Sequence, residues 1–194
     1  MVNLEKKEDF ATDVLKKQLA DAGIDISSWG TGQAKTLAHL QEEIKSGETI
    51  LITGETGKLL RKVVIVGADI YYRSSSGEEY RLREDRQVFK KDGRERRRDL
   101  GQAVSEKMKP DQDPKTAMIY GIQEELGISG KINLTKTGTD EQKTISFSYP
   151  GLEAQYIRYK FQAVLNDEQF NPDGYVEEQP DKSTYFIWEE VKKE

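Results

Sequence analysis

The sequence predicts an α+β protein in which a helical N-terminal extension precedes a strand-rich domain. Apolar residues recur at helical spacing through residues 1–47, whereas β-branched and aromatic residues alternate through much of residues 48–194. One well-capped helix, near residues 113–127, interrupts the strands. These observations predict two parts, residues 1–47 and 48–194, the second of them rich in strands.

Two N-terminal helices are expected, each ended by a glycine. The first is expected to end near Gly23 and the second at Gly47. Between them, Trp29 is interpreted as a packing anchor, and His39 on the second helix as a surface residue without an acidic partner nearby. The apolar residues that mark the helices are Phe10, Val14, Leu15 and Leu19, then Leu37, Leu40 and Ile44.

Short runs of β-branched and aromatic residues predict the strands of the second part. Residues 74–77 form a turn signal inside a long hairpin, and the polar residues 171–183 are expected to form a loop. The predicted strands are residues 49–53, 62–73, 79–90, 101–108, 131–137, 144–148, 155–164 and 184–188.

The interrupting helix is predicted from its ends as well as its periodicity. Asp113 is a good N-cap, and Pro114 follows at the first helical position. Gly127 is placed to end the helix in the left-handed conformation. Glu124 and Glu125 therefore lie in its last turn.

This segment, residues 105–128, resembles the signature box of the Nudix family, which reads G, five residues, E, seven residues, then R-E-U-x-E-E-x-G-U, where U is aliphatic. The register fits without a gap, but all departures lie upstream of residue 122. The matching positions are Ile122, Glu124, Glu125, Gly127 and Ile128; the departures are Glu106, Gln112, Tyr120 and Gly121, at the family's first glycine, first glutamate, arginine and second glutamate.

The resemblance implies a Nudix-like α/β/α sandwich with a mixed sheet. It also implies that Mg²⁺ or Mn²⁺, if the site is active, is bound by Glu124 and Glu125, which neutralises phosphate charge while water attacks. In this family an acid from a loop near the last strand often serves as a base or further ligand. Glu177 and Glu178 are the candidates for that role, so the catalytic set is Glu124, Glu125, Glu177 and Glu178.

The departures predict a weakened metal site. A carboxylate at position 121 would share one helix face with Glu124 and Glu125, and Gly121 removes it. Gln112 offers only a neutral oxygen, and Tyr120 cannot hold carboxylates as a guanidinium does. Gly121 is either a relic or makes room for a group packed closely against the backbone.

Two groups of cations are candidates for binding a ligand's phosphates. Arg96, Arg97 and Arg98 belong to a basic segment, residues 90–98, directly before the box, and Arg158 lies on a predicted strand. Each has an ordinary alternative, because the segment also fits a solvated charged hairpin and a strand arginine often covers an aromatic neighbour.

Composition limits the remaining classes. The 194 residues, 35% hydrophobic and 34% charged, suffice for one domain-sized core and an accessory segment. With no cysteine and one histidine, a metal must be held by oxygen atoms. The net charge of -5 argues against general nucleic-acid binding, and the absence of a long apolar run argues against membrane insertion and predicts a cytoplasmic location.

Three functional classes follow from the sequence. The favoured one is a Nudix-like module with a degenerate box that binds a nucleotide, another phosphorylated ligand or a protein partner, with little or no hydrolysis. The second is a Mg²⁺- or Mn²⁺-dependent hydrolase of nucleoside diphosphate derivatives that uses substitute acids. The third is a structural or scaffolding protein that uses its N-terminal helices to oligomerise; a protein partner and a homodimer are the expected assemblies.

Overall fold

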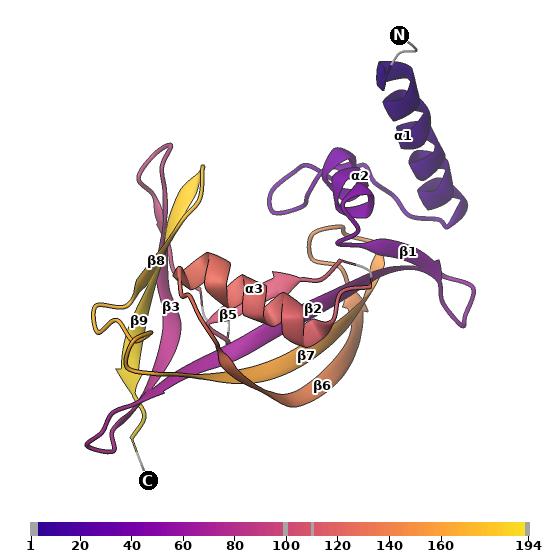
Figure 1. Ribbon diagram of the computed structural model, residues 1–194. Helices are drawn as coiled ribbons and strands as arrows, with labels where there is room; N and C mark the ends of the chain where they lie inside the picture. The colour runs from indigo at the N-terminus through magenta and orange to yellow at the C-terminus, as the bar shows by residue number, and fades with distance from the viewer. Residues whose placement is uncertain (1–3, 99–100, 110, 193–194) are drawn as a thin grey trace. The chain divides into compact units, whose positions relative to one another are not determined.

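A computed structural model of the chain describes residues 4–98, 101–109 and 111–192 and shows an α+β protein, as predicted (Figure 1). Three helices and nine strands make up these residues. In chain order they are α1 (Leu4–Asp21), α2 (Leu37–Lys45), β1 (Ile50–Thr53), β2 (Leu59–Arg73), β3 (Glu79–Phe89), β4 (Glu95–Arg96), β5 (Val104–Lys107), α3 (Pro114–Leu126), β6 (Asn133–Ile145), β7 (Glu153–Leu165), β8 (Tyr175–Glu178) and β9 (Lys182–Glu190).

The strands pair in the order β6-β7-β2-β3-β9-β8, with β1 and β5 on β2 and β4 on β3. The pairs β2–β3, β3–β9 and β8–β9 are antiparallel. Lys58, just before β2, contacts Glu153 of β7, and Arg61 within β2 contacts Tyr156. Each partner lies 95 residues later, so β2 and β7 run parallel. The sheet is therefore mixed, as the resemblance implies.

The chain forms two compact units. The first comprises residues 1–64, 107–111 and 141–157, and the second residues 65–106, 112–140 and 158–194. These units do not test the division at residue 47, which stays a prediction. No helix within the described ranges combines the length and apolar character needed to cross a bilayer.

The first unit is built around a small apolar core and a buried ion pair. The Nη2 atom of Arg61 donates to Glu43 at 2.6 Å, and their side chains are only 4% and 8% exposed. Lys35 donates to the other carboxylate oxygen at 2.6 Å, and Trp29 Nε1 donates to Pro150 O at 3.0 Å, which anchors Trp29 as predicted. The core residues are Leu15, Leu19, Leu40, Tyr149 and Leu152.

The second unit packs α3 on the sheet and uses an aromatic cluster to fix the segment before β8. Phe170 stacks on Tyr72 with ring centroids 3.7 Å apart and lies 5.2 Å from Trp188. Trp188 Nε1 donates to Asn171 O at 2.8 Å. Residues 166–174 are thereby held where they lead directly into Tyr175, the first residue of β8.

Three details differ from the sequence prediction. Residues 144–148 are not a separate strand, because β6 continues to Ile145 and a turn follows. The predicted loop over residues 171–183 contains β8, which pairs with β9. The strand predicted over residues 101–108 is shorter, because residues 101–103 form a bend and β5 covers only Val104–Lys107.

Candidate functional site

Helix α3 has the ends that its sequence predicts. The side chain of Asp113 accepts a hydrogen bond from the backbone N–H of Thr116 at 2.8 Å, and Gly127 has a φ of 63°. The Asp113 cap satisfies one free N–H group of the first turn, and left-handed Gly127 ends the helix, which fixes where the last turn lies. That turn carries Glu124, which is exposed, and Glu125, which is partly buried.

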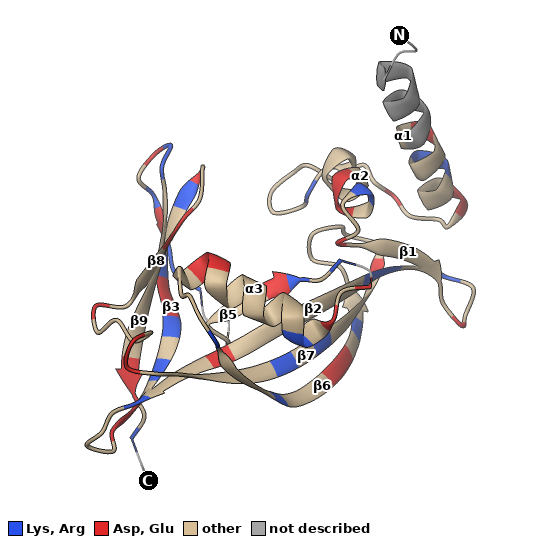
Figure 2. Cartoon of the chain, viewed as in Figure 1, with Lys and Arg blue, Asp and Glu red and all other residues tan. Residues whose placement is uncertain are grey.

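Glu125 is the acid at which carboxylates gather. Burial, together with the nearby charges of Glu106, Glu177 and Glu84 and a hydrogen bond with Glu106, raises the pKa of Glu125 to about 9. A carboxyl group with such neighbours keeps its proton at neutral pH, because ionisation would place like charges together in a poorly solvated site. Figure 2 shows acidic residues at the C-terminal end of α3 and on β5.

Glu106 reaches Glu125 across Gly121. An ideal Cβ on Gly121 would lie 2.9 Å from Glu106 Cγ, 3.4 Å from Met118 Cε and 3.7 Å from Val104 Cγ1. Contacts under 3.0 Å are not tolerated without movement. Of the two explanations for Gly121, the structure therefore supports the one in which glycine makes room for a close neighbour.

The Glu125→Gln change is expected to stabilise the metal-free protein at alkaline pH. Because the pKa of Glu125 rises from its ordinary 4.5 to about 9, its stabilising contribution is complete below pH 4.5 and is lost as pH rises through 9. Glutamine does not ionise, so the variant should gain on the order of 2 kcal/mol over the natural chain at pH 9 and little at pH 5.

Urea denaturation at both pH values, in the presence of a chelator, measures this difference. The Glu124→Gln variant is the matched control, because Glu124 is the exposed neighbour on the same helix. An equal gain at both pH values for Glu125→Gln would contradict the raised pKa.

A β-bulge positions the cationic side of the site. The register of β3 against β9 shifts between Glu84 and Arg86, and both Glu84 and Asp85 become buried as a result. Arg98 Nε donates to Glu84 Oε1 at 2.8 Å and Arg98 Nη2 donates to Glu84 Oε2. This bidentate pair holds Arg98 beside the acid that also influences Glu125.

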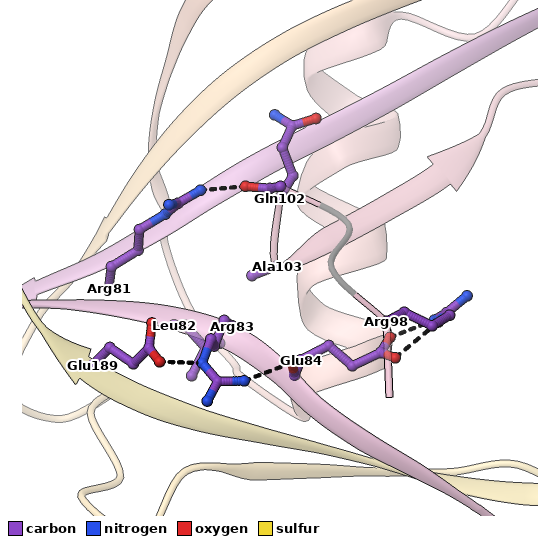
Figure 3. A pocket seen from close by; sticks show the side chains of 9 residues that line it. Arg81, Leu82, Arg83, Glu84, Arg98, Gln102, Ala103 and Glu189 are labelled. Atoms are coloured by element: carbon purple, nitrogen blue, oxygen red, sulfur yellow. Dashed lines mark hydrogen bonds and ion pairs between the residues drawn. The ribbon is translucent and has the colours of Figure 1, made fainter. Parts of the chain in front are cut away.

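Next to this pair lies a cavity of about 420 Å³, which we call the arginine cavity (Figure 3). Arg81, Arg83 and Arg98 surround it, and Glu84 lies between the last two. Within the described part of the chain, Arg83 Nη2 and Arg98 Nη1 donate to no protein group. The lining residues are Arg81, Leu82, Arg83, Glu84, Arg98, Gly101, Gln102, Ala103 and Glu189.

Three of the predicted acids lie together at a second cavity. Glu124, Glu177 and Glu178 line a second cavity, of about 410 Å³, between the end of α3 and the β8–β9 turn. Glu178 is paired there with Lys90 at 2.8 Å. Glu177 forms no ion pair with another described residue and accepts a 2.6 Å hydrogen bond from the side chain of Gln179.

Of the four predicted ligand-binding arginines, only Arg98 lines the arginine cavity. Arg96 and Arg97 are exposed, and Arg97 pairs with Asp85. Arg158 lies on β7, 3.8 Å from Asp140. Sequence analysis did not single out Arg81 and Arg83, whose alternation along β3 places both on the cavity.

The donor set suits Mg²⁺ or Mn²⁺ in its chemistry, because it consists of carboxylate oxygens. Among residues 4–98, 101–109 and 111–192, no group of three or more acids and histidines is arranged to hold a metal ion. Glu106 and Glu125 are in direct contact, however, and Mg²⁺ is commonly bound by one or two carboxylates together with a ligand's phosphates. The two carboxylates therefore fit a divalent cation whose remaining coordination positions water or a ligand's phosphates would fill.

No family model matches the chain, and no curated protein matches it in sequence. Among solved structures, a C. elegans Ap4A hydrolase in a binary complex is similar, with a TM-score of 0.37 and 15% identity over 65% of this chain and 78% of that one. The Nudix hydrolase RenU from M. smegmatis is similar with a TM-score of 0.37 and 13% identity, over 72% and 78%. The T. brucei MERS1–RNA complex has a TM-score of 0.33 and 19% identity, over 57% and 39%. Scores this low assign neither a family nor an activity.

Proposed function

We propose that this protein is a Nudix-like module with a degenerate box that binds a nucleotide or another phosphorylated small molecule and hydrolyses it little or not at all. The observation that carries the proposal is the arginine cavity, which shares Glu84 with the carboxylates around Glu125 of the box helix. Cationic and acidic groups thus adjoin within one unit, as a phosphate and its accompanying metal ion require.

The cavity suits phosphate in particular. A guanidinium presents several N–H donors in one plane, and it binds phosphate oxygens through charge-assisted hydrogen bonds. Arg83 and Arg98 use some of these donors on Glu189 and Glu84, which fixes their orientation. Their remaining donors can then bind a phosphate without a large loss of side-chain entropy.

Weak hydrolysis follows from the groups that the box lacks. Gln112 stands where the family has a glutamate, so a neutral amide replaces a charged acid. Tyr120, at the family's arginine position, is 64% exposed and does not orient the acids. With fewer charged oxygens to bind the cation, less of the charge that develops on phosphorus-bound oxygens would be neutralised.

A second candidate, a hydrolase that uses substitute acids, is favoured by the grouping of Glu106 and Glu177 around Glu125. When bound, a divalent cation would polarise the phosphoanhydride and lower the pKa of water. Glu106 and Glu125 would hold it, and Glu177 on β8 would accept the proton from the attacking water.

Binding is tested with ADP and with inorganic pyrophosphate, each with Mg²⁺, by isothermal titration calorimetry. Arg83→Ala is expected to weaken binding about tenfold, because it removes a charge-assisted hydrogen bond from the cavity. Arg73→Ala is the matched control, since Arg73 also pairs with a glutamate on a strand but lies outside the cavity. Equal affinity in the natural chain and Arg83→Ala would contradict the proposed site.

Turnover separates the two candidates. A panel of nucleoside diphosphate derivatives is incubated with Mg²⁺ or Mn²⁺ and either the natural chain or the folded Glu124→Gln, Glu125→Gln double variant. The binding module predicts equal background hydrolysis in both proteins. Turnover by the natural chain alone would establish the hydrolase instead.

A further inference from the structure

We propose that Glu106, on strand β5, supplies the carboxylate that helix α3 lacks at Gly121, and that Gly121 is required for Glu106 to reach its position. The inference deepens the proposed function and rests on it in one respect, namely that α3 is the helix that carries the metal-binding acids. Glu106 stands at the position where the family's box has its first glycine, and Gly121 stands where the family has its second glutamate. Glycine and glutamate have thus exchanged places between the strand and the helix.

The first support is steric. Gly121 is buried in the helix face that contacts β5, and its missing Cβ would lie only 2.9 Å from Glu106 Cγ. Val104 and Met118, both fully buried, close the remaining sides of this space. Glu106 therefore passes closely over Gly121, and this approach is possible because residue 121 has no side chain.

The second support is the position of the Glu106 carboxyl group. Position 121 shares a helix face with residue 125, whose side chain leans back toward it because helix side chains tilt toward the N-terminus. Glu106 arrives from the strand and forms a hydrogen bond with Glu125. Its carboxyl group therefore lies beside the same partner that a helix-borne carboxylate would have.

The chemical consequence is a pair of carboxylates from two elements. Glu106 and Glu125 can hold one hard divalent cation, and Glu84 and Glu177 add negative charge nearby. Since Glu84 also lines the arginine cavity, the pair lies close to the place proposed for the ligand's phosphates. The exchange thus keeps a carboxylate pair beside the phosphate site although the helix has lost one of its acids.

Packing is tested without metal by a double-mutant cycle. Gly121→Ala alone is expected to lower Tm by about 3 °C, because the new Cβ collides with Glu106. In a Glu106→Ala background the same change is expected to raise Tm by about 3 °C, because alanine is a better helix former than glycine. Gly121→Ala effects of the same sign and size in both backgrounds would overturn the packing relation.

Metal binding is tested with Mn²⁺ alone, followed by water-proton relaxation. Glu106→Ala should weaken Mn²⁺ binding at least about tenfold, and the folded Glu106→Ala, Gly121→Glu double variant should restore it to within about threefold. Glu168→Ala is the control, an exposed acid on the loop before β8. Its affinity should equal that of the natural chain.

Three results would overturn the inference: no Mn²⁺ binding by the natural chain, unchanged binding by Glu106→Ala, or a folded double variant that does not regain affinity. None of them bears on the arginine cavity, which is tested separately by phosphate binding to Arg83→Ala. If Arg83→Ala binds phosphate as well as the natural chain does, the proposed ligand site is wrong. The exchange of carboxylate between Gly121 and Glu106 would still hold, provided that the Mn²⁺ results are as expected.

Discussion

Replacing Glu43 with alanine is expected to destabilise the protein by about 3–5 kcal/mol, because it leaves the buried Arg61 without its carboxylate partner. Lys35 and Lys107 would lose the same partner, and Thr49 would lose a 3.2 Å hydrogen bond to Glu43. Urea denaturation measures the loss. Glu42→Ala, which removes an exposed acid from the same helix, should cost no more than about 0.5 kcal/mol.

The same ion pair predicts a loss of stability in acid. Burial alone disfavours the charged form of Glu43, but hydrogen bonds from Lys35 and Arg61 lower its pKa from 4.5 to about 2. The stabilisation is therefore complete above pH 4.5 and lost as pH falls through 2. A Glu43→Ala variant that loses stability as steeply as the natural chain over this range would contradict the assignment.

Replacing Gly174 with alanine is expected to cost about 3–4 kcal/mol, because two effects combine at this position. Gly174 has a φ of 82°, and an ideal Cβ would lie 2.0 Å from the backbone oxygen of Phe186 on β9. Neither β8 nor β9 can yield without breaking their antiparallel pairing. The variant should therefore also displace Glu177 from Glu125.

Gly77→Ala separates the two effects. Gly77 has a φ of 94°, but an added Cβ would meet no atom within 4 Å. It should cost only the backbone strain, about 1 kcal/mol. If both variants lose the same stability in urea denaturation, the close approach of Gly174 to β9 does not exist in solution.

Local chemistry made helix α3 predictable. Asp113, Pro114 and Gly127 specify its ends through interactions with neighbours only a few residues away, and the structure confirms both ends. Strand β8 was missed for the opposite reason. The strand has only four residues, Tyr175–Glu178, and some of them are polar. Its conformation depends on pairing with β9.

Only the site residues that belong to the box motif could be predicted from the sequence. Glu125 follows from the motif, but Glu84 influences it from a bulge in β3 that the sequence does not reveal. Gly121 was the available signal for Glu106, because a glycine inside a helix often marks a close neighbour. The cytoplasmic location, the protein partner and the homodimer stay predictions.

The most direct test of the central claim is a crystal structure of the protein with methylenediphosphonate and Mn²⁺, the first a non-hydrolysable diphosphate. The account predicts phosphonate oxygens within hydrogen-bonding distance of Arg83 and Arg98 in the arginine cavity, on the side of Glu84. A diphosphonate bound elsewhere, with the cavity holding only water, would contradict it.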